Sequence, residues 1–196
     1  MPRRPRIILE GGYYHILTRG NDRRKLFRYR QDYNFFLRTA KRYLKKYPLN
    51  IINYCLMPNH LHILVQVNKA DDLPKFMQGL LQVYASYFRR KYHSAGFVFQ
   101  NRYKSIYIER DGYLLECARY IERNPLRAKI ANNIHDYPWS SFLHYAKGSS
   151  DDIIKIDNPL YLALADSTEE RRQLYLKYLL EERPYEQIVD NTFRAF

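Results

Sequence analysis

The sequence lacks several features that would place it in a familiar class. It has only two cysteines, Cys55 and Cys117, and neither belongs to a C-x-x-C pair. Their isolation argues against a zinc ribbon and favours buried thiols in a reducing cytosol. No apolar run approaches the length of a membrane span, and residues 1–10 lack the hydrophobic region of a signal peptide. We therefore expect a cytoplasmic protein with no membrane partner.

Acidic residues are scarce over most of the chain. Residues 1–150 carry 27 Lys+Arg against 10 Asp+Glu, a net of +17, whereas residues 151–196 carry 6 against 10. This asymmetry predicts a polyanionic partner for the first region only. Twenty tyrosines accompany the basic groups, and such a mixture suits single-stranded nucleic acid, although most of these rings are expected to be ordinary core and surface aromatics.

Two histidines begin an alternating stretch, His60-Leu-His-Ile-Leu-Val-Gln-Val67. Side chains alternate between the faces of a strand, so both imidazoles leave the same face, about 7 Å apart along it. Two neutral imidazoles at this spacing can bind one divalent ion. The pattern alone leaves open whether the pair binds metal or is incidental.

The order of predicted elements indicates the fold. We expect strands at 13–19, 49–57, 60–67 and 105–110, one helix after an Asp32 N-cap up to Tyr47, and a second from Asp71-Asp72 to about Tyr92. The order β-α-β-β-α-β is that of the ferredoxin-like α+β fold, an antiparallel sheet with both helices on one face. Leu61, Ile63 and Val65 should then face these helices, and the histidines should face the open side.

A short helix, residues 113–123, is predicted next, with Asp111 as its cap and Asn124-Pro125 as its end. Residues three or four apart share a helix face, so Glu116, Tyr120 and Asn124 should gather on one side. A phenol can act as a nucleophile, and an amide oxygen can join two imidazoles on a metal. The pattern by itself favours a core tyrosine and a helix-terminal asparagine over a catalytic pair.

The remaining segments carry fewer signals. Arg3, Arg4 and Arg6 form a basic arm, and residues 20–25 form a basic turn. Trp139 and Phe142 are expected to pack their segment back onto the sheet. Helical patterns at 160–165 and 168–182 predict a helical C-terminal extension. We therefore divide the chain into a domain at 1–145 and an extension of unknown role at 146–196.

Several ordered blocks resemble one known family. Met57-Pro-Asn-His-Leu-His-Ile-Leu-Val65 resembles the HUH motif (His, bulky apolar, His) of single-tyrosine transposases. Similar agreement with later or earlier blocks of these proteins occurs at residues 20–24, 99–105, 111–115, 119–128 and 137–141. Together the blocks are most similar to the REP-associated tyrosine transposases, bacterial proteins that process short palindromic repeats.

The resemblance implies a role for each matching residue. His60 and His62 would be metal ligands for Mg²⁺ or Mn²⁺, Tyr120 would be the nucleophile, and Asn124 would complete the metal site, with Glu116 as its local competitor. The fold would carry the tyrosine helix across the open face of the sheet. The activity would be metal-dependent cleavage and rejoining of single-stranded DNA beside a hairpin, through a 5′-phosphotyrosine intermediate.

Further expectations concern the partner and the assembly. Candidate DNA contacts, chosen by charge clustering, are Arg19, Arg23, Arg24, Arg102 and Lys104. The partner would be single-stranded or hairpin DNA with REP-like palindromes, bound by a nucleoid-associated monomer or homodimer. Two other functions stay open: a non-catalytic binder of hairpin DNA or RNA with a vestigial metal site, and a metal-dependent phosphodiesterase that uses water.

Overall fold

The computed structural model describes residues 7–108 and 113–181. Its first part contains β1 (Tyr13–Arg19), η1 (Asn21–Arg23), α1 (Arg30–Lys46), β2 (Asn50–Met57), β3 (His60–Gln66), α2 (Asp72–Tyr92) and β4 (Lys104–Ile108). Its second part contains α3 (Tyr113–Arg127), η2 (Ile134–Asp136), α4 (Phe142–Lys147), α5 (Pro159–Leu162) and α6 (Thr168–Leu180). The basic arm at residues 3–6 and the Asp111 cap lie outside the described residues.

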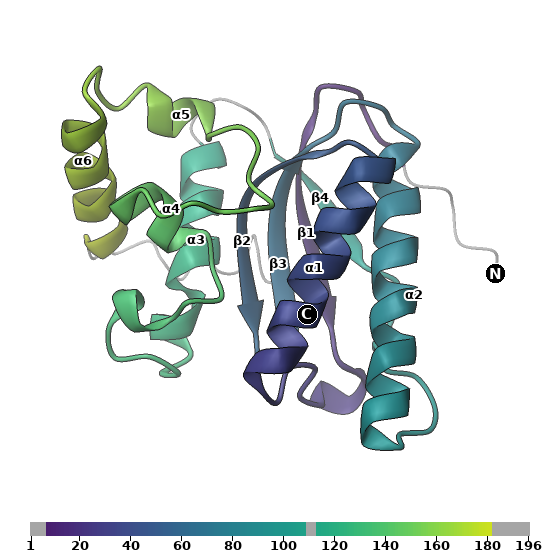
Figure 1. Ribbon diagram of the computed structural model, residues 1–196. Helices are drawn as coiled ribbons and strands as arrows, with labels where there is room; N and C mark the ends of the chain where they lie inside the picture. Colours follow the sequence, from purple (N-terminus) through teal and green to yellow (C-terminus); the bar gives the residue numbers. More distant parts are fainter. Residues whose placement is uncertain (1–6, 109–112, 182–196) are drawn as a thin grey trace.

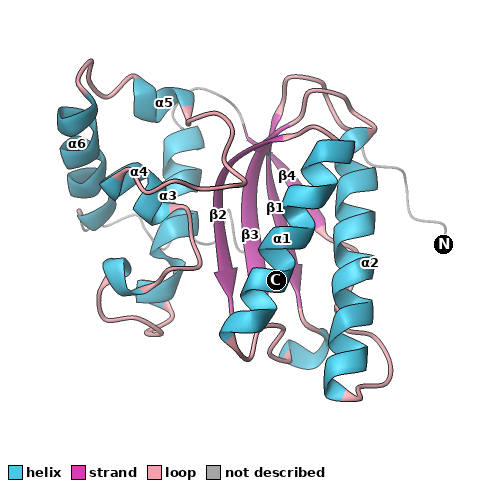
Figure 2. Ribbon diagram, viewed as in Figure 1, coloured by secondary structure: helices cyan, strands magenta, loops and turns pink. Residues whose placement is uncertain are grey.

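The four strands form one sheet in the order β2-β3-β1-β4, and every neighbouring pair is antiparallel. This is the predicted ferredoxin-like arrangement. Helices α1 and α2 pack on one face, while α3 to α6 gather on the other side, next to β2 (Figure 1). Figure 2 shows the magenta strands between these two groups of helices. The predicted α+β fold is confirmed.

The buried side chains of β3 divide between two hydrophobic clusters, according to the face of the sheet on which they lie. Leu61, Ile63 and Val65 belong to the cluster that contains the buried side chains of α1 and α2. Leu64 belongs to the other cluster, with Tyr120 and the buried side chains of α3. The predicted alternation of β3 is therefore confirmed, and the histidines lie on the α3 face.

A bulge in β2 was not foreseen. Ile51 pairs with Val65 and Asn53 pairs with Leu64, so the register shifts by one residue between them. The extra residue, Ile52, lets both Ile52 and Asn53 reach the α3 side, since a bulge places two residues opposite one. Asn53 is fully buried there, and its side chain donates a hydrogen bond to Glu122 of α3.

Helix α3 continues past the predicted stop. It runs to Arg127 and carries Pro125 inside it. Proline removes the N–H that would bond the carbonyl of Ile121. The Asn124 side-chain nitrogen lies 2.7 Å from the Tyr120 carbonyl oxygen and 3.4 Å from that of Ile121, so the side chain donates where the backbone does not. This local replacement explains why the prediction of an end at Asn124 is wrong.

The start of α1 also differs from the prediction. The helix begins at Arg30, and Asp32 lies in its first turn rather than at the N-cap. The Asp32 carboxylate still accepts hydrogen bonds from the backbone N–H groups of Arg28 and Tyr29, at 2.8 and 2.9 Å. An acidic side chain therefore binds free N–H groups of the helix start, from the third helical position rather than from the N-cap, because the N-cap is Tyr29.

The C-terminal segment packs against β2 and α3. Trp139 stacks on Tyr33 of α1 at 4.4 Å between ring centroids, and its carbonyl accepts from Leu56 N at 2.8 Å. Phe142 is fully buried in the main core, which confirms that this segment folds back. Tyr175 and Leu179 of α6 belong to the same cluster. The boundary at residue 145 stays a prediction.

Within the described ranges, none of the helices is both long enough and apolar enough to span a bilayer.

Candidate nucleophile and metal site

The strand register sets the positions of the candidate residues. Cys55, His62, Leu17 and Lys104 form one row across the four strands, and directly paired residues share a face. The next row on the same face, two residues closer to the end of the sheet, pairs His60 with Arg19. The histidines therefore lie in the centre of the sheet, at the end where β3 begins, with basic groups beside them.

Each histidine has one ring nitrogen bound to a neighbouring side chain. His60 Nδ1 lies 2.7 Å from Asn59 Oδ1, an acceptor, so Nδ1 carries the proton and Nε2 has a lone pair. His62 Nδ1 lies 2.9 Å from His15 Nε2. His62 Nε2 is buried and has no hydrogen-bond partner within the described residues. Metal-binding histidines are typically held in this way, with the second nitrogen on a fixed partner.

Burial keeps these imidazoles neutral. It lowers the pKa of His15 to about 3. Burial and the nearby Arg19 lower the pKa of His60 to about 4. The pKa of His62 falls well below its usual value because of burial, with His60, His15 and Arg127 adding to the effect. Neutral imidazoles are the form that binds metal ions.

Tyr120 lies against the same cluster. Its ring centroid is 5.6 Å from that of His62 and 5.8 Å from that of His15, in edge-on contacts. His60 and His62 also meet edge-on at 5.0 Å. The Arg127 guanidinium lies 5.1 Å from the centre of the Tyr120 ring. The structure thus brings the candidate nucleophile, both candidate ligands and a cation together within one chain.

Asn124 and Glu116 of α3 are the two candidates for a third metal ligand. Asn124 is one turn after Tyr120, and its amide nitrogen is engaged by its own helix, which leaves the amide oxygen as the donor toward a cation. The Glu116 carboxylate accepts a hydrogen bond from Tyr178 of α6 at 2.7 Å. Among the described residues no group of three or more His, Cys, Asp or Glu could hold a metal ion.

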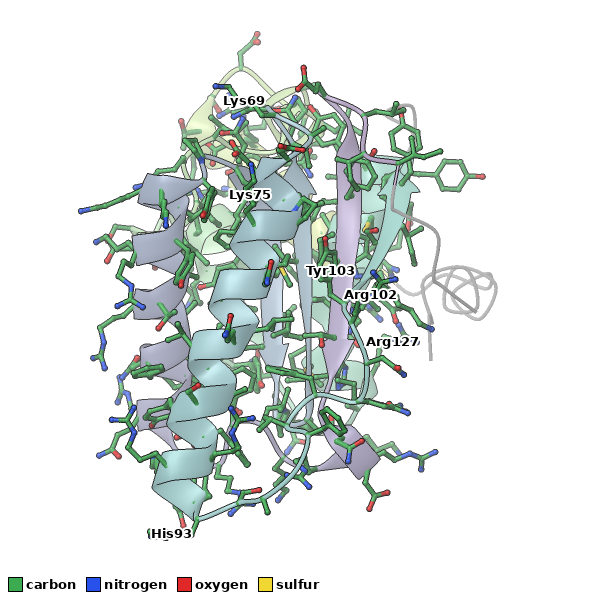
Figure 3. The ribbon with its side chains drawn as sticks, turned by 90° about the vertical axis from the view of Figure 1, so that its right-hand side faces the viewer. Lys69, Lys75, His93, Arg102, Tyr103 and Arg127 are labelled. Carbon is green, nitrogen blue, oxygen red and sulfur yellow. The ribbon has the colours of Figure 1, made fainter. Side chains whose placement is uncertain are left out.

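The five candidate DNA contacts lie near the same end of the sheet. Arg19 is beside His60, and Lys104 is in the row of His62. The loop with Arg23 and Arg24 is bound to the β2–β3 turn, where Asn59 Nδ2 donates to the Arg23 carbonyl at 3.4 Å. Arg102 is exposed just before β4. Figure 3 shows Arg102 and Arg127 on the same side of the molecule.

Sequence reasoning missed two residues of this cluster, His15 and Arg127. His15 could have been found by alternation, because it lies on the same face of β1 as Leu17, whose partner is His62. Arg127 is seven residues after Tyr120, about two helical turns, and so lies on the same side of the helix. The early helix end predicted at Asn124 placed Arg127 outside the helix.

Comparison with known proteins identifies the family. The family model described as "Transposase IS200 like" matches residues 9–124, more than half of the chain. The chain belongs to the IS200-like transposase family. The matched region includes β1, both candidate metal ligands and Tyr120, and it ends at Asn124.

Two relatives of this transposase agree with the resemblance seen in the sequence. A Haemophilus influenzae protein named as a REP-associated tyrosine transposase is 29% identical over 154 residues, which cover 70% of this chain and 83% of that protein. A solved structure of a REP-associated tyrosine transposase bound to a REP hairpin is 18% identical, with a TM-score of 0.64 over 78% of this chain and 90% of that chain. The predicted resemblance is confirmed, and the fold is shared.

Proposed function

We propose that this transposase cleaves and rejoins single-stranded DNA beside a hairpin, with Tyr120 as the nucleophile. The observation that carries the proposal is the contact of Tyr120 with His62 inside one buried histidine cluster. A tyrosine against neutral imidazoles is suited to phosphodiester transesterification. The hairpin substrate is supported by family membership and by the REP hairpin in the complex of the structural relative.

The donor set fits a divalent ion. His62 Nε2 is a buried nitrogen with no protein partner in the described part of the chain, and leaving such an atom unpaired costs free energy unless a ligand binds it. His60, His62 and Asn124 would hold Mg²⁺ or Mn²⁺. When bound, the ion supplies Lewis-acid polarisation of the scissile phosphate.

The protein residues account for the covalent step. The Tyr120 phenol loses its proton, and its oxygen attacks the phosphorus of the scissile phosphodiester. A Tyr120 O–P bond forms, the bond from phosphorus to the 3′ oxygen breaks, and that oxygen takes up a proton. The free 3′-hydroxyl can later attack the phosphotyrosine and reseal a strand, so no external energy source is needed. The Arg127 guanidinium, 5.1 Å from the centre of the Tyr120 ring, brings a positive charge close to the nucleophile.

The geometry also supports an active site within one chain. Tyr120, His15 and His62 belong to the same chain and are in ring contact. Neither a monomer nor a homodimer needs to exchange α3 to bring these groups together. The basic end of the sheet, with Arg19 and Lys104 beside the histidines, would hold the phosphates on either side of the cleaved bond.

An adduct assay tests the proposal. A hairpin oligonucleotide with single-stranded flanks, labelled at its 3′ end, is incubated with the protein and Mn²⁺ and then separated under denaturing conditions. A 5′-phosphotyrosine link retains the 3′ fragment, so label should move with the protein. The adduct should disappear with EDTA, in Tyr120→Phe and in His62→Ala, but persist in Tyr113→Phe, which removes an exposed phenol from the same helix.

Each other result identifies a rival function. An adduct that survives Tyr120→Phe would reject this nucleophile. Strand cleavage without an adduct would indicate a phosphodiesterase that uses water. Salt-dependent binding without cleavage, over a broad pool of hairpins and with either Mg²⁺ or Mn²⁺, would indicate a non-catalytic binder.

A further inference from the structure

A buried carboxylate lies on the side of α3 opposite Tyr120. Glu122 is completely buried, and two residues on a helix project about 200° apart. Tyr120 faces the histidines of β1 and β3, whereas Glu122 faces β2, α4 and α6. The two side chains are therefore coupled by the rotation of a single helix about its axis.

Glu122 is bound by three separate elements. Its Oε1 accepts from Asn53 Nδ2 at 2.8 Å, at the bulge of β2. The same oxygen accepts from the hydroxyl of Ser141, the residue before α4. Its Oε2 accepts from the Tyr175 hydroxyl of α6 at 2.9 Å. Three donors around a fully buried carboxylate hold it far more tightly than any single contact would.

Further contacts join the same two parts of the chain. The Arg119 guanidinium donates to the carbonyls of Tyr178 and Glu181, where α6 ends. Arg123 donates to the Leu179 carbonyl. These cations satisfy carbonyl groups of the last turn of α6, which have no partner within that helix. Arg119 and Arg123, which lie about one turn apart on α3, therefore both bind the C-terminal end of α6.

We propose that residues 139–181 position the nucleophile, and that Glu122 is the positioning residue through which they act. The IS200-like match ends at Asn124, so Ser141 and Tyr175 lie outside it. The proposal rests on the proposed role of Tyr120. It assigns to the C-terminal segment a function in catalysis, because anchoring Glu122 sets the direction in which Tyr120 leaves the helix.

Three substitutions in the network and one matched control separate positioning from general stability. Tyr175→Phe removes the hydroxyl that binds Glu122. Tyr84→Phe removes an equally buried hydroxyl that donates to the Leu26 carbonyl at 2.7 Å, in the α1–α2 layer. Glu122→Gln keeps the shape and an acceptor, and its new amide can donate to the Tyr175 hydroxyl, which also accepts. Glu122→Leu removes every polar contact.

The first measurement is single-turnover adduct formation by the full chain on a saturating hairpin oligonucleotide. We expect the rate to fall about 10-fold in Tyr175→Phe and at least 30-fold in Glu122→Leu, while the Kd for the hairpin changes less than twofold, because displacement of a nucleophile by an ångström costs rate rather than binding. Tyr84→Phe and Glu122→Gln should stay within threefold of the parent. Equal rates in Tyr175→Phe and Tyr84→Phe would overturn the proposal.

The second measurement does not need catalysis. A single 3-fluorotyrosine is placed at position 120, and its ¹⁹F chemical shift reports the edge-on contacts with His15 and His62. The resonance should move or broaden in Glu122→Leu and Tyr175→Phe and stay unchanged in Tyr84→Phe and Glu122→Gln. An unchanged resonance in all four variants would refute positioning. If the parent forms no adduct, the proposed function fails, and this spectrum still decides the present inference.

Discussion

The two sides of α3 contain buried polar groups of opposite character. On one side, the histidine cluster has a buried nitrogen, His62 Nε2, without a hydrogen-bond partner in the described residues. On the other side, both oxygens of Glu122 accept hydrogen bonds from neighbouring elements. One helix therefore separates an incompletely satisfied cluster from a fully satisfied one.

This contrast distinguishes a binding site from an anchor. An unpaired buried polar atom destabilises the fold, and a ligand that bound it would remove that cost. A carboxyl group that accepts hydrogen bonds from three donors instead fixes the elements around it. We infer that the histidine side is built for a ligand and that the Glu122 side holds the helix in place.

Loss of a metal ligand should have the largest effect. His62→Ala removes the unpaired nitrogen, and we expect Mn²⁺ affinity to fall by more than about 100-fold, since loss even of outer partners costs 10- to 100-fold. The unfolding free energy should also fall, by roughly 1–3 kcal/mol, because the buried ring leaves a cavity and His15 loses its hydrogen-bond partner. An EPR titration of free Mn²⁺ measures the affinity. Unchanged binding would show that His62 is not a metal ligand.

Loss of the anchor should lower the stability of the fold and leave Mn²⁺ binding intact. Glu122→Leu leaves the donors of Asn53, Ser141 and Tyr175 without their acceptor, which should lower the unfolding free energy by roughly 2–3 kcal/mol. Mn²⁺ affinity should stay within threefold of the parent. Urea denaturation at pH 6 measures the stability. A variant as stable as the parent would show that this network does not hold α3.

The two sides should respond to pH with opposite sign. Burial raises the pKa of Glu122 from 4.5 to about 7, so its contribution to stability is complete below pH 4.5 and is lost as pH rises through 7. Burial lowers the pKa of His15 and His60, so their contribution is present above pH 6.5 and is lost as pH falls toward 4.

The titration can be isolated with one isosteric change. Glu122→Gln cannot ionise, so its stability relative to the parent should increase between pH 4.5 and 7, by on the order of 2 kcal/mol. His144 and Tyr175 also face this carboxyl, and both are retained in the variant. Urea denaturation from pH 4.5 to pH 8 measures the difference. A constant difference over this range would contradict the raised pKa.

The smallest effect concerns the partner of a ligand. His15→Phe removes the nitrogen that lies 2.9 Å from His62 Nδ1, and Mn²⁺ affinity should fall about 10-fold. His15→Gln offers an amide group in place of that nitrogen and should recover most of the loss. The same EPR titration applies. Equal affinities for the parent and His15→Phe would show that His62 needs no orienting partner.

The local sequence patterns were sufficient to predict the sheet and the positions of the candidate residues on β3 and α3. Alternation along β3 placed Leu61 and Ile63 against α1 and α2 and put His60 and His62 on the other face, since this depends only on the two-residue period of a strand. The ferredoxin-like order followed from the order of the elements. The spacing of Tyr120 and Asn124 placed them on one side of a helix.

Contacts between distant segments were not predictable in this way. The His15–His62 pair depends on the register between β1 and β3. The Glu122 network depends on a bulge in β2 and on Tyr175, which follows Glu122 by 53 positions. None of these features has a local sequence period.

The sequence by itself therefore determined the strand and helix periods, the excess of basic groups and the motif blocks that indicate the family. Only the tertiary structure decided which buried groups meet. It paired His62 with His15, set Arg127 over Tyr120 and surrounded Glu122 with donors. The physical reason is that periodicity is a property of neighbouring residues, whereas hydrogen bonding of a buried side chain depends on elements that packing brings together from across the chain.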